Sequence, residues 1–85
     1  MEEYISLDKL RLGQYGEVVH LNATKDMNKR LMDMGLIIGT TVRCVGVSLM
    51  GDPKAYLIRG AVIAIRDRDS KDITIRTKKE VKLDV

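Results

Sequence analysis

Short segments in which apolar and polar residues alternate, divided by glycines, constrain the fold of this chain more than any other feature. The alternation is plain in residues 40–47 and 73–76, and the apolar run 56–65 is interrupted by Arg59 and Gly60. A two-residue period indicates strands, and Gly60 can adopt the positive φ that a tight turn requires. We therefore predict about five short strands, including a hairpin that turns at Gly60.

The first of these strands, expected over residues 17–21, departs from strict alternation because Val18 and Val19 are adjacent. Neighbouring side chains of a flat strand point to opposite faces of the sheet. Both valines can be buried only if the strand carries a β-bulge or is covered on both faces. The sequence leaves these two alternatives open.

Residues 26–34 have a helical period instead. Met27, Leu31 and Met34 recur at i, i+4 and i+7, which places them in one stripe of a short helix. An isolated helix of this length is marginal in water, so the stripe must pack against the rest of the fold. Leu31 and Met34, together with Leu36, are therefore expected in the core.

The ends of this helix also have recognisable signals. Either Thr24 or Asp26 can accept hydrogen bonds from the unpaired N–H groups of the first turn. Gly35 follows the last stripe residue, where a left-handed cap is easiest without a β-carbon. We predict a positive φ at Gly35.

The size and composition fit a single domain. With 85 residues, 45% of them apolar and 32% charged, the chain resembles a folded globular protein rather than a disordered one. A chain this short has room for one core but little for a deep catalytic cleft. We therefore predict a mainly β fold, a small closed or nearly closed barrel of about five strands with one short α-helix.

The net charge of +3 is concentrated at the end of the chain. Residues 1–75 carry 11 Lys or Arg against 10 Asp or Glu, whereas residues 76–85 carry four cations against two carboxylates. We divide the chain into a barrel over residues 1–75 and a basic tail over residues 76–85. Apolar residues alternate in the tail as well, which would allow an added strand, at Val81, Leu83 and Val85.

Several features favour a cytoplasmic protein. No apolar run approaches the ~20 residues needed to span a membrane. The N-terminal residues 1–4 are acidic and lack the apolar stretch of a secretory signal. Cys44 is the only cysteine, so no internal disulfide can form.

Four segments occur together and in order. They are Leu10-x-Leu12-Gly13 with Gly16 shortly after, the block from Arg30 to Thr40, the turn Gly51-Asp52-Pro53, and the segment from Arg59 to Arg66. Over about residues 5–75 the chain resembles the ferrous iron transport protein A (FeoA) family. The most specific of the four is the block that reads Arg-Leu-x-x-Met-Gly-Leu-x-x-Gly.

The resemblance implies an SH3-like barrel and a regulatory role in bacterial ferrous iron uptake. Such proteins are expected to dock on the cytoplasmic part of a membrane transporter for Fe²⁺ that carries a GTPase domain. It implies contact with that transporter rather than catalysis, cofactor binding or membrane insertion. Self-association, and whether the contact activates or inhibits transport, stay open.

Some residues of these segments are candidates for binding the partner, namely Arg30, Met32, Asp52, Pro53 and Arg59. Met32 lies off the helical stripe and would suit an adaptable docking surface. Arg30 and Arg59 could each pair with a carboxylate, either within the barrel or on the partner. A second set is expected to hold the local structure: Leu31, Met34, Gly35, Gly39 and Gly60.

Other kinds of site have little support in the sequence. His20 and Cys44 are the only imidazole and thiol and lie on different predicted strands, so we expect neither a metal site nor a catalytic nucleophile. Asp67, Asp69 and Asp72 alternate with basic residues and are expected in a solvated loop.

The alternative function is a small nucleic-acid-binding or metal-repressor-type regulatory domain, with the basic tail in contact with phosphates. The nearly neutral body argues against it. Base stacking requires aromatic platforms, and the chain offers only Tyr4, Tyr15 and Tyr56. We therefore expect no nucleic-acid partner.

Overall fold

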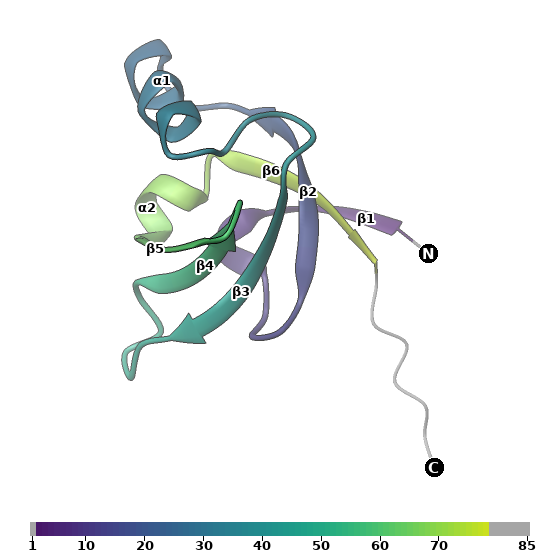
Figure 1. Ribbon diagram of the computed structural model, residues 1–85, viewed down its shortest axis with the longest axis vertical. Coiled ribbons are helices and arrows are strands. Elements are labelled where there is room, and N and C mark those ends of the chain that lie inside the picture. Colours follow the sequence, from purple (N-terminus) through teal and green to yellow (C-terminus); the bar gives the residue numbers. More distant parts are fainter. Residues whose placement is uncertain (1, 79–85) are drawn as a thin grey trace.

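The computed structural model describes residues 2–78 (Figure 1). Within that range the chain forms six β-strands, two α-helices and one 3₁₀-helix, so the predicted mainly β class is confirmed. The elements in chain order are β1 (Glu2–Ser6), η1 (Leu7–Lys9), β2 (Tyr15–Leu21), α1 (Lys25–Asp33), β3 (Thr41–Val47), β4 (Lys54–Ile58), β5 (Ala61–Ile65), α2 (Asp67–Ser70) and β6 (Ile73–Lys78).

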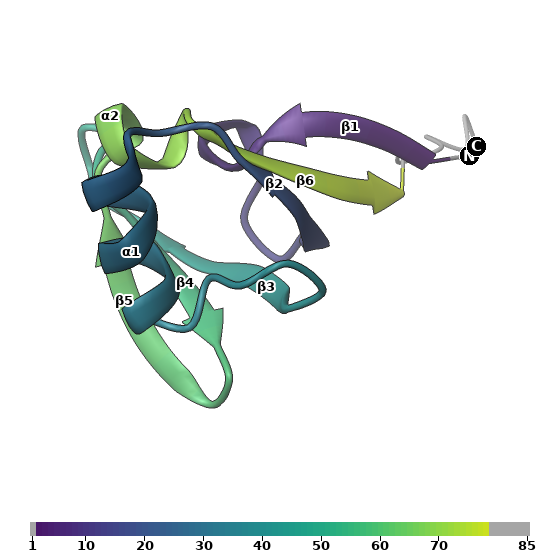
Figure 2. The same ribbon diagram turned by 90° about the horizontal axis from the view of Figure 1, so that it is seen from above.

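The strands of this range belong to one antiparallel sheet in the order β1–β6–β2–β3–β4–β5. The sheet curls so that β1, β6 and β2 face β3, β4 and β5 (Figure 2). The outermost strands, β1 and β5, do not pair, so the sheet is open where the sequence predicted a closed or nearly closed barrel. Each edge strand has only five residues, and short edges limit pairing with other chains.

The core fills the space between the two halves of the curled sheet. Its buried apolar side chains come from every strand except β1, and from η1, α1 and the loops after them. Ile5, Met27 and Met34 are among the partly buried side chains that pack against it. The buried set is Leu7, Leu10, Val18, Leu31, Leu36, Val42, Cys44, Tyr56, Ile58, Ile65, Ile73 and Ile75.

Strand β2 carries a β-bulge at the two adjacent valines. Val18 is paired with Ile75 and His20 with Thr74, so the register between β2 and β6 shifts between Val18 and His20. Val18 is buried and Val19 is partly exposed. The bulge was one of the two alternatives that the sequence left open.

Helix α1 lies at one end of the curled sheet, near β5 and α2 (Figures 1 and 2). The hydroxyl of Thr24 accepts a hydrogen bond from the N–H of Met27 across 3.2 Å, so Thr24 caps the helix. Gly35 has φ +99°, as predicted, and the N–H of Leu36 donates to the carbonyl of Leu31 across 3.0 Å. These bonds form the left-handed cap that glycine favours after a helix.

Three further expectations differ from the structure. Residues Glu2–Ser6 form β1, a strand that was not among those predicted from the sequence. Residues Asp67–Ser70, expected in a solvated loop, form the single turn of α2. Strand β6 continues through Lys78, so the first residues of the segment 76–85 belong to the sheet, while the expected strand over 81–85 lies outside the described residues.

Candidate functional site

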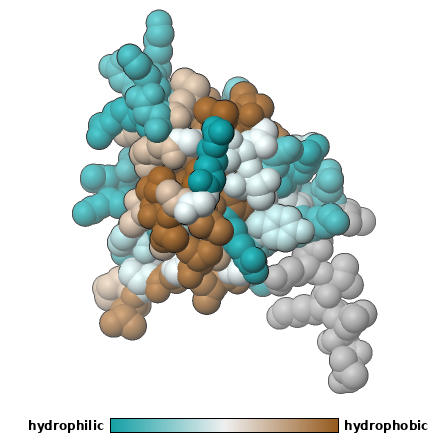
Figure 3. Space-filling model, viewed as in Figure 1, coloured by the Kyte–Doolittle hydropathy of each residue, from teal (hydrophilic) through white to brown (hydrophobic). Residues whose placement is uncertain are grey.

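The outer face of β3, β4 and β5 exposes a group of apolar side chains, which we call the apolar face. It consists of Val45, Ala55, Leu57, Val62 and Ala64. The side chain of Val62 is 64% exposed, that of Val45 40% and that of Leu57 37%. The apolar surface is visible as brown atoms over these strands in Figure 3.

The strand register brings these residues together. Leu57 of β4 lies opposite Val62 of β5, and Ala55 lies opposite Ala64. Their neighbours along the strands, such as Tyr56 and Ile58, point inward and are buried. Because the core is filled from the inner face, the outer apolar side chains remain available to a partner.

A cation borders the apolar face on β3. Arg43 lies opposite Leu57, and its Nε donates to the carbonyl of Gly13 across 3.1 Å. This bond holds the guanidinium beside the loop that precedes β2. The face therefore combines an apolar centre with a basic edge, as protein interfaces often do.

The turn between β3 and β4 adds two of the most exposed apolar side chains of the described residues. Leu49 is 106% exposed and Met50 is 91% exposed. The N–H of Gly51 donates to the carbonyl of Ser48 across 2.9 Å, which closes this turn. We call Leu49 and Met50 the apolar turn tip.

The residues predicted to bind the partner do not form one site. Arg30 and Met32 lie on α1, whereas Asp52 and Pro53 lie in the β3–β4 turn at the other end of the molecule (Figure 1). Met32 is 44% exposed, so its side chain is available on the outer surface of α1. Any partner that contacts both groups must cover the length of the domain.

Arg59 lies in the β4–β5 turn with φ +50°. Its aliphatic stem crosses Gly35, because a β-carbon at Gly35 would lie 3.4 Å from Cδ of Arg59. Among residues 2–78, neither Arg59 nor Arg30 takes part in an ion pair. Within the described part of the chain, the alternative of a carboxylate partner in the barrel is therefore not realised.

Asp52 and Pro53 both take part in hydrogen bonds within the domain. The carboxylate of Asp52 accepts a hydrogen bond from the backbone N–H of Asp67, across 2.9 Å. Pro53 follows a cis peptide bond, and its carbonyl accepts a hydrogen bond from the N–H of Ser48 across 3.3 Å. Both residues are exposed, but Asp52 has a structural partner within the domain.

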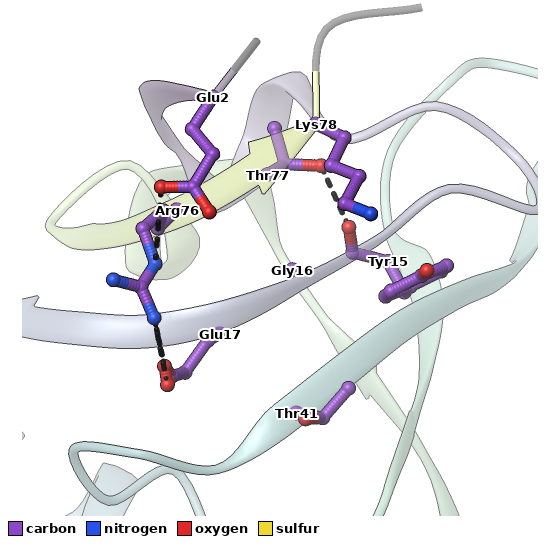
Figure 4. Close-up of a pocket in the computed structure, with 8 residues that line it drawn as sticks. All are labelled: Glu2, Tyr15, Gly16, Glu17, Thr41, Arg76, Thr77 and Lys78. Atoms are coloured by element: carbon purple, nitrogen blue, oxygen red, sulfur yellow. Dashed lines mark hydrogen bonds and ion pairs between the residues drawn. The ribbon is translucent and has the colours of Figure 1, made fainter.

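A shallow hollow of about 200 Å³ is lined by residues of β1, β2, β3 and β6 (Figure 4). Nη2 of Arg76 lies 2.7 Å from Oε1 of Glu17, and its Nε lies 3.9 Å from Oε2 of Glu2. The Glu17 carboxylate raises the pKa of Arg76 further above its usual value. Because these charges neutralise one another, the hollow has little attraction for a charged ligand.

The imidazole and the thiol do not form a site. His20 is exposed on β2, and Cys44 is buried on β3 with its thiol 3.7 Å from the carbonyl of Gly46. Across residues 2–78, no group of three or more His, Cys, Asp or Glu side chains is arranged to hold a metal ion. None of the helices in the same range is long and apolar enough to cross a membrane.

Sequence reasoning missed the apolar face. The signal was present in residues 56–58 and 61–65, where apolar residues occupy both alternating positions. A strand with one face on the core and one in water normally alternates apolar with polar residues. Apolar residues on both faces therefore indicate a second contact, although the sequence does not say with what.

Comparison with known proteins places these features in a family. The family model of the FeoA domain matches residues 5–77. The NMR structure of a FeoA-like protein from Clostridium acetobutylicum has a TM-score of 0.84 and 27% identity, over 99% of this chain and 98% of that protein. The NMR structure of FeoA from Chlorobium tepidum has a TM-score of 0.81 and 26% identity, over 92% of this chain and 74% of that one.

A third structure supports the fold assignment. The crystal structure of Stenotrophomonas maltophilia FeoA complexed with zinc has a TM-score of 0.70 and 24% identity, over 84% of this chain and 88% of that one. That protein is described as a prokaryotic SH3 domain protein, so the curled sheet reported above has the SH3-like fold. Among curated proteins, none matches this sequence.

Proposed function

The chain belongs to the FeoA family of small ferrous iron transport accessory domains, and from this premise we propose that it docks on the transporter for Fe²⁺. The contact would be with the cytoplasmic part of that membrane protein, which carries a GTPase domain. The chain would regulate transport by this contact, in the cytoplasm, without an enzymatic reaction of its own.

The apolar face is the observation that carries this proposal. Leu57 and Val62 lie opposite each other on adjacent strands and are exposed, although the core beneath them is complete. Val45 on β3, the other neighbour of β4, is also exposed. Burial of apolar surface contributes about 25 cal/mol per Å². A partner that covered this face would gain stabilisation that the isolated domain leaves unused, which supports a role in binding.

The arginines near the face support a partner with acidic groups at the edge of its own interface. Arg43 borders the face on β3, and Arg59 lies in the turn that joins its other two strands. Arginine is well suited to interfaces because its planar group can form two hydrogen bonds with one carboxylate. Charge at the rim would favour the correct orientation more than it would add affinity.

Calorimetric titration with the purified cytoplasmic portion of the transporter, including its GTPase domain, tests the proposal. The unmodified chain should bind, and Leu57→Asp and Val62→Asp should each weaken binding at least about tenfold, because a carboxylate would be buried without a partner. Absence of binding at high concentration would contradict docking on this portion of the transporter.

Ile38→Asp is the matched control. Ile38 is 66% exposed, close to the 64% of Val62, but it lies in the loop before β3 rather than on the apolar face. The same change in charge and polarity at Ile38 should leave the affinity within about threefold of the original. Equal losses at Ile38 and Val62 would show that binding does not depend on the apolar face.

The nucleic-acid alternative has less support in the described residues. It relied on the basic tail, but Arg76 is part of β6 and is paired with Glu17. Lys79 and Lys82 lie outside the described residues. If the chain did bind nucleic acid through its tail, the affinity would fall steeply as the salt concentration rises.

A further inference from the structure

A groove separates α1 from the segment that joins β5 to α2. Its volume is about 250 Å³. Three side chains of the α1 stripe, Met27, Leu31 and Met34, line one side, and Ala64 and Ile65 of β5 line the other. Met27 and Met34 are partly exposed, and methionine side chains adapt readily to different apolar partners. The floor of the groove is thus apolar and adaptable.

Three arginines also line this groove. Arg30 projects from α1, Arg66 precedes α2, and Arg68 lies within α2. All three are exposed, and none of the ion pairs among residues 2–78 involves them. They differ in this from Arg76, which is paired with Glu17. No carboxylate of residues 2–78 therefore forms an ion pair with the three cations.

The positive charge of the groove favours a negatively charged ligand. Asp69 is the one carboxylate among the lining residues, against three arginines. This concentration of charge is not evident in the sequence, because Arg30 is far from Arg66 and Arg68 in the chain. Asp67 and Asp69 also follow those two arginines directly. In the structure, Asp67 pairs instead with Lys54 across 3.2 Å.

We propose that this groove binds an acidic peptide segment of a protein partner, with a large aliphatic side chain on the floor and flanking carboxylates on the arginines. Arginine binds a carboxylate through two parallel hydrogen bonds. The apolar floor requires an apolar side chain between the carboxylates of the peptide. A single-stranded nucleic acid fits less well, because none of the lining residues is aromatic and bases need a stacking platform.

The groove adjoins the apolar face, since Ala64 belongs to both. The proposal thus extends the proposed function by giving the partner's chemistry, but it does not depend on the transporter. Its test uses synthetic peptides, so the two proposals can fail separately. Loss of transporter binding at Val62→Asp with intact peptide binding would distinguish them.

The first measurement is NMR of the methionine methyl groups during titration with a synthetic peptide in which leucines alternate with pairs of glutamates. The methyl resonances of Met27 and Met34 should shift. Those of Met32 and Met50 should not, because neither side chain lines the groove. Shifts confined to Met32 or Met50 would overturn the proposal.

Two further peptides and an oligonucleotide test the chemistry. Replacing the glutamates by glutamines, or the leucines by serines, should weaken binding at least about tenfold. Equal binding of the glutamine peptide would overturn the role of the arginines. Oligothymidylate should not displace the acidic peptide; if it did so at lower concentration than the peptide itself binds, the groove would be a nucleic-acid site instead.

Charge reversal identifies the residues. Arg66→Glu and Arg68→Glu should each lower the affinity for the acidic peptide about tenfold or more. Lys29→Glu should lower that affinity less than about threefold. Lys29 is the matched control, because it is exposed on α1 next to Arg30 but does not line the groove. Equal losses at Lys29 and the arginines would show that only the overall charge matters and would overturn the site.

Discussion

The carboxylate of Asp52 accepts a hydrogen bond from the backbone N–H of Asp67 across 2.9 Å, which joins the β3–β4 turn to the start of α2. The ammonium group of Lys54 reinforces the connection, since its Nζ lies 3.2 Å from Oδ1 of Asp67 and 2.7 Å from the carbonyl of Asp8. These bonds connect the β3–β4 turn and the start of β4 to η1 and to α2, which are distant in the chain. The Gly-Asp-Pro turn therefore has a structural role beyond reversing the chain.

Replacing Asp52 by alanine should lower the free energy of unfolding by about 1–2 kcal/mol. The first turn of a helix has N–H groups without helical partners, and a carboxylate that accepts from one of them forms a charge-assisted bond. Urea denaturation followed by circular dichroism measures the change. Asp52→Asn keeps an oxygen acceptor and should lose less than half as much. If Asp52→Ala is as stable as the original, the bond to Asp67 contributes nothing.

The local features of this fold were largely predictable from the sequence. The end of α1 depends on a glycine that can adopt positive φ, and Gly35 stands where the apolar stripe stops. The bulge in β2 was one of the two alternatives that the adjacent valines left open. Such features depend on steric properties of a few neighbouring residues, so a short stretch of sequence contains the information.

Features that depend on distant partners were not predictable in the same way. Strand β1 has only five residues, and its pairing with β6 joins the two ends of the described chain. Whether β1 and β5 meet depends on the twist of the whole sheet, which no local pattern reports. The groove arginines likewise come from α1 and α2, which become neighbours only after folding.

Two glycines with similar φ angles allow the stability cost of backbone strain to be separated from the cost of crowding by an added β-carbon. Gly35 has φ +99° and Gly39 has φ +94°. A β-carbon at Gly35 would lie 3.2 Å from Cγ2 of Ile58, whereas one at Gly39 would meet nothing within 4 Å. Gly39→Ala should therefore cost about 1–2 kcal/mol from backbone strain alone. Gly35→Ala should cost about 1 kcal/mol more, because it also crowds the core.

Thermal and urea denaturation of the two alanine variants measure this difference. Both should melt below the original protein, with Gly35→Ala the less stable. Equal stabilities would show that Ile58 moves away at no cost. A Gly35→Ala variant as stable as the original would contradict the left-handed conformation itself.

The buried hydroxyl of Tyr56 should make the fold sensitive to alkali. It donates to the carbonyl of Leu7 across 3.3 Å, and burial raises the pKa of Tyr56 well above its usual value. In the unfolded chain the hydroxyl should ionise near the unperturbed tyrosine pKa of about 10. The stabilising contribution is complete below that pH and is lost as the pH rises above it, because only the unfolded chain releases the proton.

Melting temperatures measured from about pH 8 to about pH 11, a range that includes the unperturbed tyrosine pKa of about 10, test this dependence of stability on pH. The original protein should lose stability above pH about 10 more steeply than Tyr56→Phe, which has no group to ionise there. The comparison cancels the titration of the lysines, which both proteins share. Parallel curves for the two proteins would show that Tyr56 ionises as easily in the folded state.

Truncation of two adjacent residues of β4 should cost very different amounts of stability if the apolar face is a binding surface. Ile58 is 1% exposed, so Ile58→Ala should cost about 2–5 kcal/mol through lost burial and a residual cavity. Leu57 points outward, so Leu57→Ala should cost less than about 1 kcal/mol. Urea denaturation of both variants gives the comparison. A loss at Leu57 as large as that at Ile58 would mean that the outer face stabilises the domain itself, which would remove the main reason to assign it to a partner.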